Sequence, residues 1–188
     1  MLTLTTPSES PARNRVREWF FAQPDVSVTL SELIEHTRIA KTTAHTIAHE
    51  FIKEGFLTKK TVGRAWQLSV RKDHEWNYTR KIAVNLNHIF ESGLLTHIKN
   101  EYPQAKAIVL FGSYSTGQDT QASDIDIAVE IAKQQPVTTK QFATYTHLGH
   151  RKSVPVNVFV FNRKRVDRNV FASIANGIVL HGFLEANP

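Results

Sequence analysis

The stretch from Leu110 to Ile131 constrains this chain more than any other part of its sequence. The apolar run Ala107–Phe111, which leads into this stretch, is typical of a short buried strand. Gly112-Ser113 then opens a turn. After ten further residues, Asp124-Ile125-Asp126 begins a second run in which polar and apolar residues alternate. Because successive side chains of a strand point to opposite faces, Asp124 and Asp126 are expected to share one face.

Two aspartates on one strand face suggest a bound cation. Neighbouring carboxylates repel each other unless a positive charge lies between them. Mg²⁺ prefers oxygen ligands and keeps water and phosphate oxygens around it. Gly112 lets the backbone approach a phosphate, and Ser113 offers a hydroxyl and an N–H at the start of a helix. We therefore expect Asp124 and Asp126 to bind metal and Gly112 and Ser113 to bind nucleotide. The alternative is a structural glycine turn followed by a solvated acidic edge strand.

The rest of the C-terminal half alternates between predicted strands and helices. We expect a helix over 141–148, a strand over 154–161, a helix over 163–175 and a last strand over 178–181. This order predicts a small mixed-sheet α/β domain over residues 104–188. Residues 77–102 have two helical stretches that break near Ser92-Gly93, and we interpret 73–103 as a helical bridge between domains.

The pattern of Gly-Ser, ten residues and Asp-x-Asp resembles the nucleotidyltransferase family of the DNA polymerase β type, in the minimal form of the MNT-like antitoxins. The resemblance covers residues 104–188. It implies transfer of a nucleoside monophosphate, AMP above all, from an NTP, with ATP as the first choice of substrate. It also implies that Asp124 and Asp126 hold two Mg²⁺ ions.

The family carries a third catalytic carboxylate on a neighbouring strand, and the matching position here is Asn157. The catalytic set that the resemblance implies is therefore Asp124, Asp126 and Asn157. An asparagine can offer a carbonyl oxygen to a metal, but it is neutral and cannot accept a proton. Glu130 shares the strand face but lies about 13 Å beyond Asp126, too far to share the metal. The chain is thus better equipped to bind a metal–nucleotide than to transfer it.

Residues 13–72 resemble the winged helix-turn-helix family. Three short helices are expected over 14–22, 31–37 (with Ser31 as its cap) and 41–53, and two strands over 56–60 and 65–70. In that family the third helix enters the major groove and the wing meets phosphates. The DNA contacts implied here are Lys41, Thr42, Thr43, His45, Thr46 and His49 on the helix, and Lys59, Lys60 and Arg64 on the wing. The alternative is a protein-interface role.

Composition limits the classes of protein and site. Lys and Arg total 23 against 17 Asp and Glu, a net charge of +6 that is compatible with a nucleic-acid partner. Cysteine is absent, which excludes disulfides and thiolate metal sites within this chain. No apolar run is long enough to predict a membrane span. Met1 to Ala12 lacks the features of a signal peptide, so we expect a flexible tail and a cytoplasmic protein.

The sequence therefore predicts an α+β or α/β protein with an N-terminal winged helix-turn-helix followed by a nucleotidyltransferase domain. The expected function is transfer of NMP to a protein or other acceptor, coupled to binding of double-stranded DNA. No room is expected for a helical substrate domain beyond residue 188, so the chain should depend on a partner. The resemblance points to a HEPN-type toxin, and a homodimer stays open. The rivals are a catalytically weak or inactive DNA-binding regulator that senses nucleotide, and transfer to a small molecule.

Overall fold

The computed structural model describes residues 9–63 and 65–185, and its contacts divide the chain into two compact units. Unit 1 is Met1–His74 and unit 2 is Glu75–Pro188. The protein is a mixed α+β structure, with a small antiparallel sheet in unit 1 and a mixed five-stranded sheet in unit 2. Within the described ranges, no helix is both long and apolar enough to cross a membrane.

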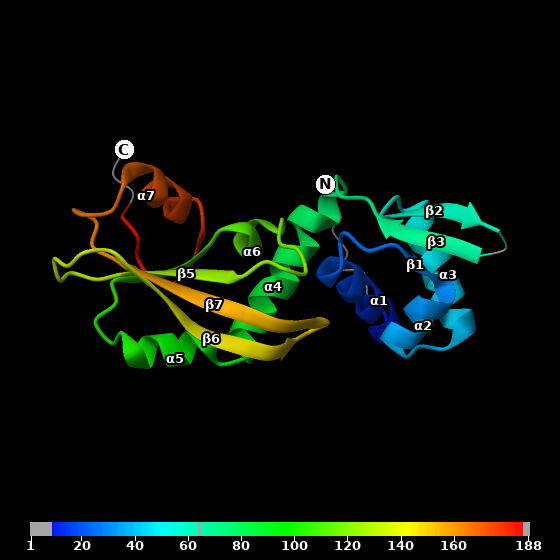
Figure 1. Ribbon diagram of the computed structural model, residues 1–188, viewed down its shortest axis with the longest axis horizontal. Coiled ribbons are helices and arrows are strands. Elements are labelled where there is room, and N and C mark those ends of the chain that lie inside the picture. Colours follow the sequence, from blue (N-terminus) through cyan, green and yellow to red (C-terminus); the bar gives the residue numbers. More distant parts are fainter. Residues whose placement is uncertain (1–8, 64, 186–188) are drawn as a thin grey trace, which may run out of the picture. The chain divides into compact units, whose positions relative to one another are not determined.

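Unit 1 combines three helices with a three-stranded sheet (Figure 1). Its strands are arranged in the order β1-β3-β2, and both pairings are antiparallel. The helix expected over 41–53 is confirmed, and its residues Ala44, Ile47, Ala48 and Phe51 are all buried at helical spacing. The elements are α1 (Pro11–Ala22), β1 (Val28–Thr29), α2 (Leu30–Thr37), α3 (Lys41–Lys53), β2 (Leu57–Val62) and β3 (Ala65–Val70).

The helix starts in unit 1 differ from those expected. The cap of α2 is Thr29 and not Ser31, since the Thr29 side chain accepts from the Glu32 amide while the Glu32 side chain accepts from the Thr29 amide. Helix α1 begins at Pro11, with Ser10 as its cap, so it includes the end of the segment expected as a tail. Residues 1–8 of that predicted tail lie outside the described residues.

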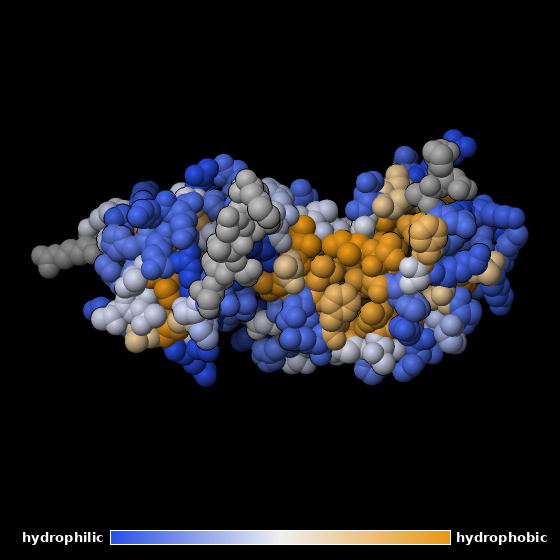
Figure 2. Space-filling view, turned by 180° about the vertical axis from the view of Figure 1, so that it is seen from behind, coloured by the Kyte–Doolittle hydropathy of each residue, from blue (hydrophilic) through white to orange (hydrophobic). Residues whose placement is uncertain are grey.

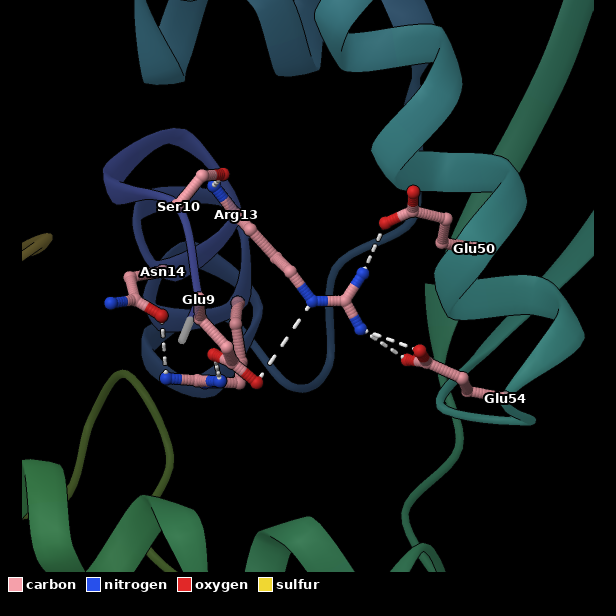
Figure 3. Close-up of polar contacts among 7 residues, drawn as sticks. Glu9, Ser10, Arg13, Asn14, Glu50 and Glu54 are labelled. Carbon is pink, nitrogen blue, oxygen red and sulfur yellow. Dashed lines mark hydrogen bonds and ion pairs between the residues drawn. The ribbon is translucent and has the colours of Figure 1, made fainter. Parts of the chain in front are cut away.

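An arginine on α1 holds the C-terminal half of α3 (Figure 3). The Arg13 guanidinium lies between Glu50 and Glu54, which follow each other by one helical turn; its Nη2 atom donates to Glu54 Oε1 at 2.6 Å, and its Nη1 atom donates to Glu50. Like charges at this spacing on a helix repel. Arg13 therefore offsets that repulsion and connects the first helix to the third.

Unit 2 is built on a sheet with the strand order β6-β7-β5-β4-β8, in which only β5 and β7 are parallel neighbours. The parallel pair aligns the two strands that carry Asp126 and Asn157. The elements are η1 (Glu75–Tyr78), α4 (Arg80–Glu91), α5 (Leu94–Glu101), β4 (Ala107–Phe111), α6 (Ser113–Thr116), β5 (Ile125–Glu130), β6 (Thr138–Leu148), β7 (Arg151–Phe161), α7 (Arg168–Ala175) and β8 (Ile178–Gly182).

Different helices pack on the two faces of this sheet. Ile125, Ile127 and Val129 pack with residues of α4 and α5 into one hydrophobic cluster, while Ala128 on the opposite face packs with Ile174 of α7 into another. Figure 1 shows α5 and α7 on opposite sides of the sheet. Residues 73–103, interpreted above as a bridge, therefore contribute two helices to the core of unit 2.

The helix predicted over 141–148 is wrong, because this segment is strand β6. Its partly or fully buried side chains, Phe142, Tyr145 and Leu148, are spaced three apart and so imitate a helical face. The register with β7 shifts between Gln141 and Ala143, which interrupts the two-residue alternation that would have indicated a strand. Pairing with β7 along almost its whole length then decides the conformation.

Candidate active site

The turn after β4 brings the backbone close to a carboxylate. Gly112 has φ +72°, a conformation that favours glycine. A Cβ atom at this position would lie 3.0 Å from Asp126 Oδ2, so a larger residue would push against the carboxylate. The expected helix after this turn is the single turn α6, beginning at Ser113. Gly112 thus lies directly beside Asp126, and Ser113 follows it in the chain.

Strand register gathers three polar residues from different parts of the chain. Asp126 is paired with Phe111 on the β4 side and with Asn157 on the β7 side. Asp124 directly precedes β5, and both aspartates are partly exposed. The structure therefore brings Asp124, Asp126 and Asn157 to one place, beside the Gly112-Ser113 turn.

The Asn157 side chain bridges the two aspartates. Its Nδ2 atom donates to Asp124 Oδ2 at 3.0 Å and to Asp126 Oδ1 at 3.3 Å. The sequence interpretation considered this residue as a carbonyl ligand of a metal, but here the amide N–H₂ group faces the carboxylates. In this state Asn157 offsets part of their mutual repulsion. Turning the amide over would present its oxygen to a cation instead.

The pKa of Asp126 lies above its ordinary value. Partial burial is the main cause, the charge of Asp124 adds to it, and the hydrogen bond from Asn157 opposes it. A cation beside both aspartates would favour their ionised forms, because it would offset the burial of Asp126 and the negative charge of Asp124. Mg²⁺ is commonly held by one or two carboxylates together with substrate phosphates, so this donor set fits a metal–nucleotide. Among the described residues, no group of three or more His, Cys, Asp or Glu side chains is arranged to hold a metal ion.

Glu130 has a structural partner instead of a place in this cluster. Its side chain is almost fully buried, and its Oε1 atom lies 3.2 Å from Arg163 Nε. Arg163 also reaches Glu185, at 3.0 Å. The buried Glu130 carboxylate is thus engaged in an ion pair with Arg163.

The residues predicted to contact DNA lie on α3 and β2 of unit 1. Lys41, Thr42, His45 and Thr46 on α3 and Lys59 and Lys60 on β2 are exposed, and Thr43 is partly so. Arg64 lies outside the described residues. The sequence interpretation missed Trp66, whose ring stacks on His45 with a centroid separation of 4.8 Å and lies 4.1 Å from Lys59 Nζ. Trp66 therefore connects the predicted recognition helix to the predicted wing.

Asp119 is a second residue that sequence reasoning missed. It lies in the loop between Ser113 and Asp124, yet it is only 2% exposed. Lys81 and Asn85 of α4 and Arg151 of β7 all contact it. One signal was present in the sequence: Lys81 and Asn85 precede the buried Ile89 at four-residue steps, which places two polar side chains on the buried stripe of a helix.

Comparison with protein families matches residues 94–182 to the family described as polymerase beta, nucleotidyltransferase. No curated protein matches the sequence of this chain. The matched region begins with α5, ends with β8 and includes the Gly112-Ser113 turn and Asp124, Asp126 and Asn157. Residues 94–182 of this chain are therefore a polymerase β-like nucleotidyltransferase domain.

Proposed function

We propose that unit 2 binds a Mg–NTP, with ATP preferred, and transfers its nucleoside monophosphate to a protein acceptor. The observation that carries the proposal is the convergence of Asp124 and Asp126 on one amide, beside a glycine turn, within a nucleotidyltransferase domain. In this reaction an acceptor oxygen forms a bond to the α-phosphorus, the bond to the leaving pyrophosphate breaks, and the acceptor proton is released.

Each group at the site has a defined task in this proposal. Asp124 and Asp126 would hold Mg²⁺, up to two ions, which when bound would supply charge neutralisation for the phosphates and orientation of the reacting oxygens. Gly112 permits the close approach of a phosphate, and Ser113 donates its amide and hydroxyl to phosphate oxygens. Asn157 supplies no charge and no base. We therefore expect the site to bind nucleotide but to transfer the nucleoside monophosphate slowly.

A protein acceptor is supported by the surface of unit 2. Figure 2 shows apolar surface gathered on one face of this unit. The large hydrophobic side chains that unit 2 exposes include Phe90, Val179 and Phe183. Extended apolar patches of this kind mark surfaces that bind other molecules. The resemblance to minimal nucleotidyltransferases points to a HEPN-type toxin as this acceptor.

The transfer proposal is tested by incubating the protein with α-labelled ATP, Mg²⁺ and the candidate acceptor, alongside calorimetry of Mg–ATP binding. Replacing both Asp124 and Asp126 by Asn should abolish Mg-dependent ATP binding and labelling. Asp167→Asn is the matched control, because Asp167 is an exposed carboxylate of the same unit whose capping role asparagine can also fill. Unchanged Mg-dependent affinity in the double variant would contradict the assignment of the site.

The second candidate function is a DNA-binding regulator that senses nucleotide without transferring it. Asn157 favours this candidate, because a neutral residue replaces the group that relatives would use to complete the catalytic set. Binding of Mg–ATP without detectable label transfer, together with a change in DNA affinity on nucleotide binding, would select the regulator.

We propose that unit 1 is a winged helix-turn-helix that binds duplex DNA. The exposed Lys41 on α3 and the exposed Lys59 and Lys60 on β2 support this, since cations near a helix N-terminus and on a wing suit phosphates. Affinity should fall by about 0.9 log units per log unit of salt for each phosphate neutralised. Lys59→Gln and Lys60→Gln should each lower that slope by about one, while Thr42→Ala and Thr43→Ala should change sequence preference instead. Failure to bind duplex at low salt would move unit 1 to a protein-interface role.

A further inference from the structure

A buried ionic cluster is centred on Asp119, in the loop that leads to Asp124, one of the two proposed metal ligands. Asp119 accepts from Asn85 Nδ2 at 2.9 Å, and its Oδ1 atom lies 3.2 Å from Lys81 Nζ. Its Oδ2 atom lies 3.6 Å from Arg151 Nη1. All four residues are at least 95% buried. Two cations and an amide from α4 and β7 thus converge on one carboxylate of the loop.

The same cluster also contacts helix α6, which precedes the loop, and Ser123 at the end of the loop. Asn85 Nδ2 also donates to the Tyr114 carbonyl at 2.9 Å, directly after Ser113. Arg151 Nη2 donates to the Ser123 carbonyl, directly before Asp124. The loop is therefore fixed next to the proposed phosphate-binding residue and next to the proposed metal ligand.

Stability alone is a weak explanation for this cluster. Buried ion pairs are rarely more stabilising than well-packed apolar residues, because each charge loses its hydration. Arg151 adds to the cost, since its buried Nε and Nη1 atoms have no hydrogen-bond partner within residues 9–63 and 65–185. Contacts of this kind can hold metal ligands in place. Loss of a residue that holds a ligand typically lowers metal affinity or activity by 10–100-fold.

We propose that Asp119 and Arg151 are positioning residues that set the Asp124 carboxylate through the Ser123 carbonyl. Asp119 fixes the guanidinium of Arg151, and Arg151 fixes the backbone in front of Asp124. The proposal deepens the Mg–NTP function proposed above and rests on it for its chemical meaning.

The test uses Arg151→Lys, which keeps a cation near Asp119 but removes the planar group that reaches Ser123. We expect Mg²⁺ affinity in the presence of ATP to fall about tenfold, and kcat for transfer to fall at least tenfold. ATP affinity without metal and KM for ATP should stay within about threefold, because Gly112 and Ser113 are not the groups displaced. Arg151→Met should lose more than Arg151→Lys.

The matched control is Arg163→Lys, which changes the arginine that pairs with buried Glu130 at the far end of the same strand, β5. It should leave Mg²⁺ affinity within about twofold of the wild type. An equal loss of metal affinity in both variants would show a general effect on the sheet and would overturn the proposal. Asp119→Asn should lower Mg²⁺ affinity as Arg151→Lys does; should it fail to fold, the arginine variants still decide.

Hydrogen exchange of the metal-free protein separates this proposal from the proposed function. Arg151→Lys should speed exchange of amides in residues 119–125 by about tenfold, and Arg163→Lys should leave them unchanged. A wild type that binds no Mg–ATP would refute the proposed function, and exchange would still decide whether Arg151 holds the loop. Unchanged exchange in Arg151→Lys would overturn the positioning role.

Discussion

At the scale of single residues, Asn157 is the side chain that joins the two aspartates of the candidate active site. Its amide donates to both Asp124 and Asp126, so it forms a neutral bridge between the two carboxylates. This bridge lowers the repulsion between the aspartates in the metal-free protein. In the function proposed above, Asn157 also leaves the site without a third carboxylate, which would slow transfer.

Asn157→Asp should reverse both effects. The change is nearly isosteric, and the added carboxylate should make the metal-free protein less stable and the Mg-loaded protein more stable. Transfer of label from α-labelled ATP should rise at least about tenfold, a modest part of the 10²–10⁴-fold usual for a positioned base. A wild-type protein that already transfers near 1 s⁻¹ or faster would argue against a handicapped site.

Asp126→Asn should stabilise the metal-free protein near neutral pH. Burial and the charge of Asp124 raise the pKa of Asp126, so the folded state holds this carboxylate at a cost once it is ionised. The gain should appear as a rise in Tm. The gain should disappear below the ordinary pKa of aspartate, where Asp126 is protonated in both states. Thermal unfolding between pH 3 and pH 8 measures it, and a pH-independent gain would mean a different cause.

At the scale of elements, ion pairs and aromatic contacts connect α3, the proposed DNA-recognition helix, to its neighbours in unit 1. Arg13 on α1 reaches Glu50 on α3 and Glu54, the residue that follows this helix. The ring of Trp66 on β3 contacts both His45 on α3 and Lys59 on β2. The two ends of α3 are thus tied to different neighbours, which suits an element that must present side chains at a defined angle.

Arg13→Gln should lower the stability of unit 1 by about 1–2 kcal/mol, because it removes charge-assisted hydrogen bonds and leaves two glutamates to repel. The exposed Lys60→Gln is the matched control and should stay within about 0.5 kcal/mol. Chemical denaturation followed by Trp19, which is buried in unit 1, measures the difference. Equal stability of the two variants would show that solvent screens the Arg13 pairs.

At the scale of the whole molecule, two units with separate cores carry two proposed ligands. A ligand that binds only the folded state protects the part it contacts, by about 2.7 kcal/mol at one hundred times its Kd. Hydrogen exchange should therefore show protection by Mg–ATP within residues 107–130 and protection by duplex DNA within residues 41–62. A single footprint shared by both ligands would contradict the assignment of one ligand to each unit.

Much of the local structure could be read from the sequence, because its cause is local. The apolar run of β4, the turn at Gly112, the alternation that places Asp124 beside Asp126 and the helical spacing of α3 all depend on neighbouring residues. Predictions of where helices start were less reliable. Thr29 and Ser31 are both good capping residues, and only the backbone geometry shows that Thr29 is the cap.

Contacts between distant segments were decided by tertiary structure alone. β6 imitated a helix in its spacing, and pairing with β7 made it a strand. The parallel register of β5 and β7 set Asn157 against Asp126, and the amide orientation followed from two carboxylates that no local pattern relates to residue 157. Asp119 resembled an ordinary loop residue until α4 and β7 surrounded it. Local periodicity records which face of an element is buried, whereas the partners that meet at that face are chosen by the packing of the whole unit.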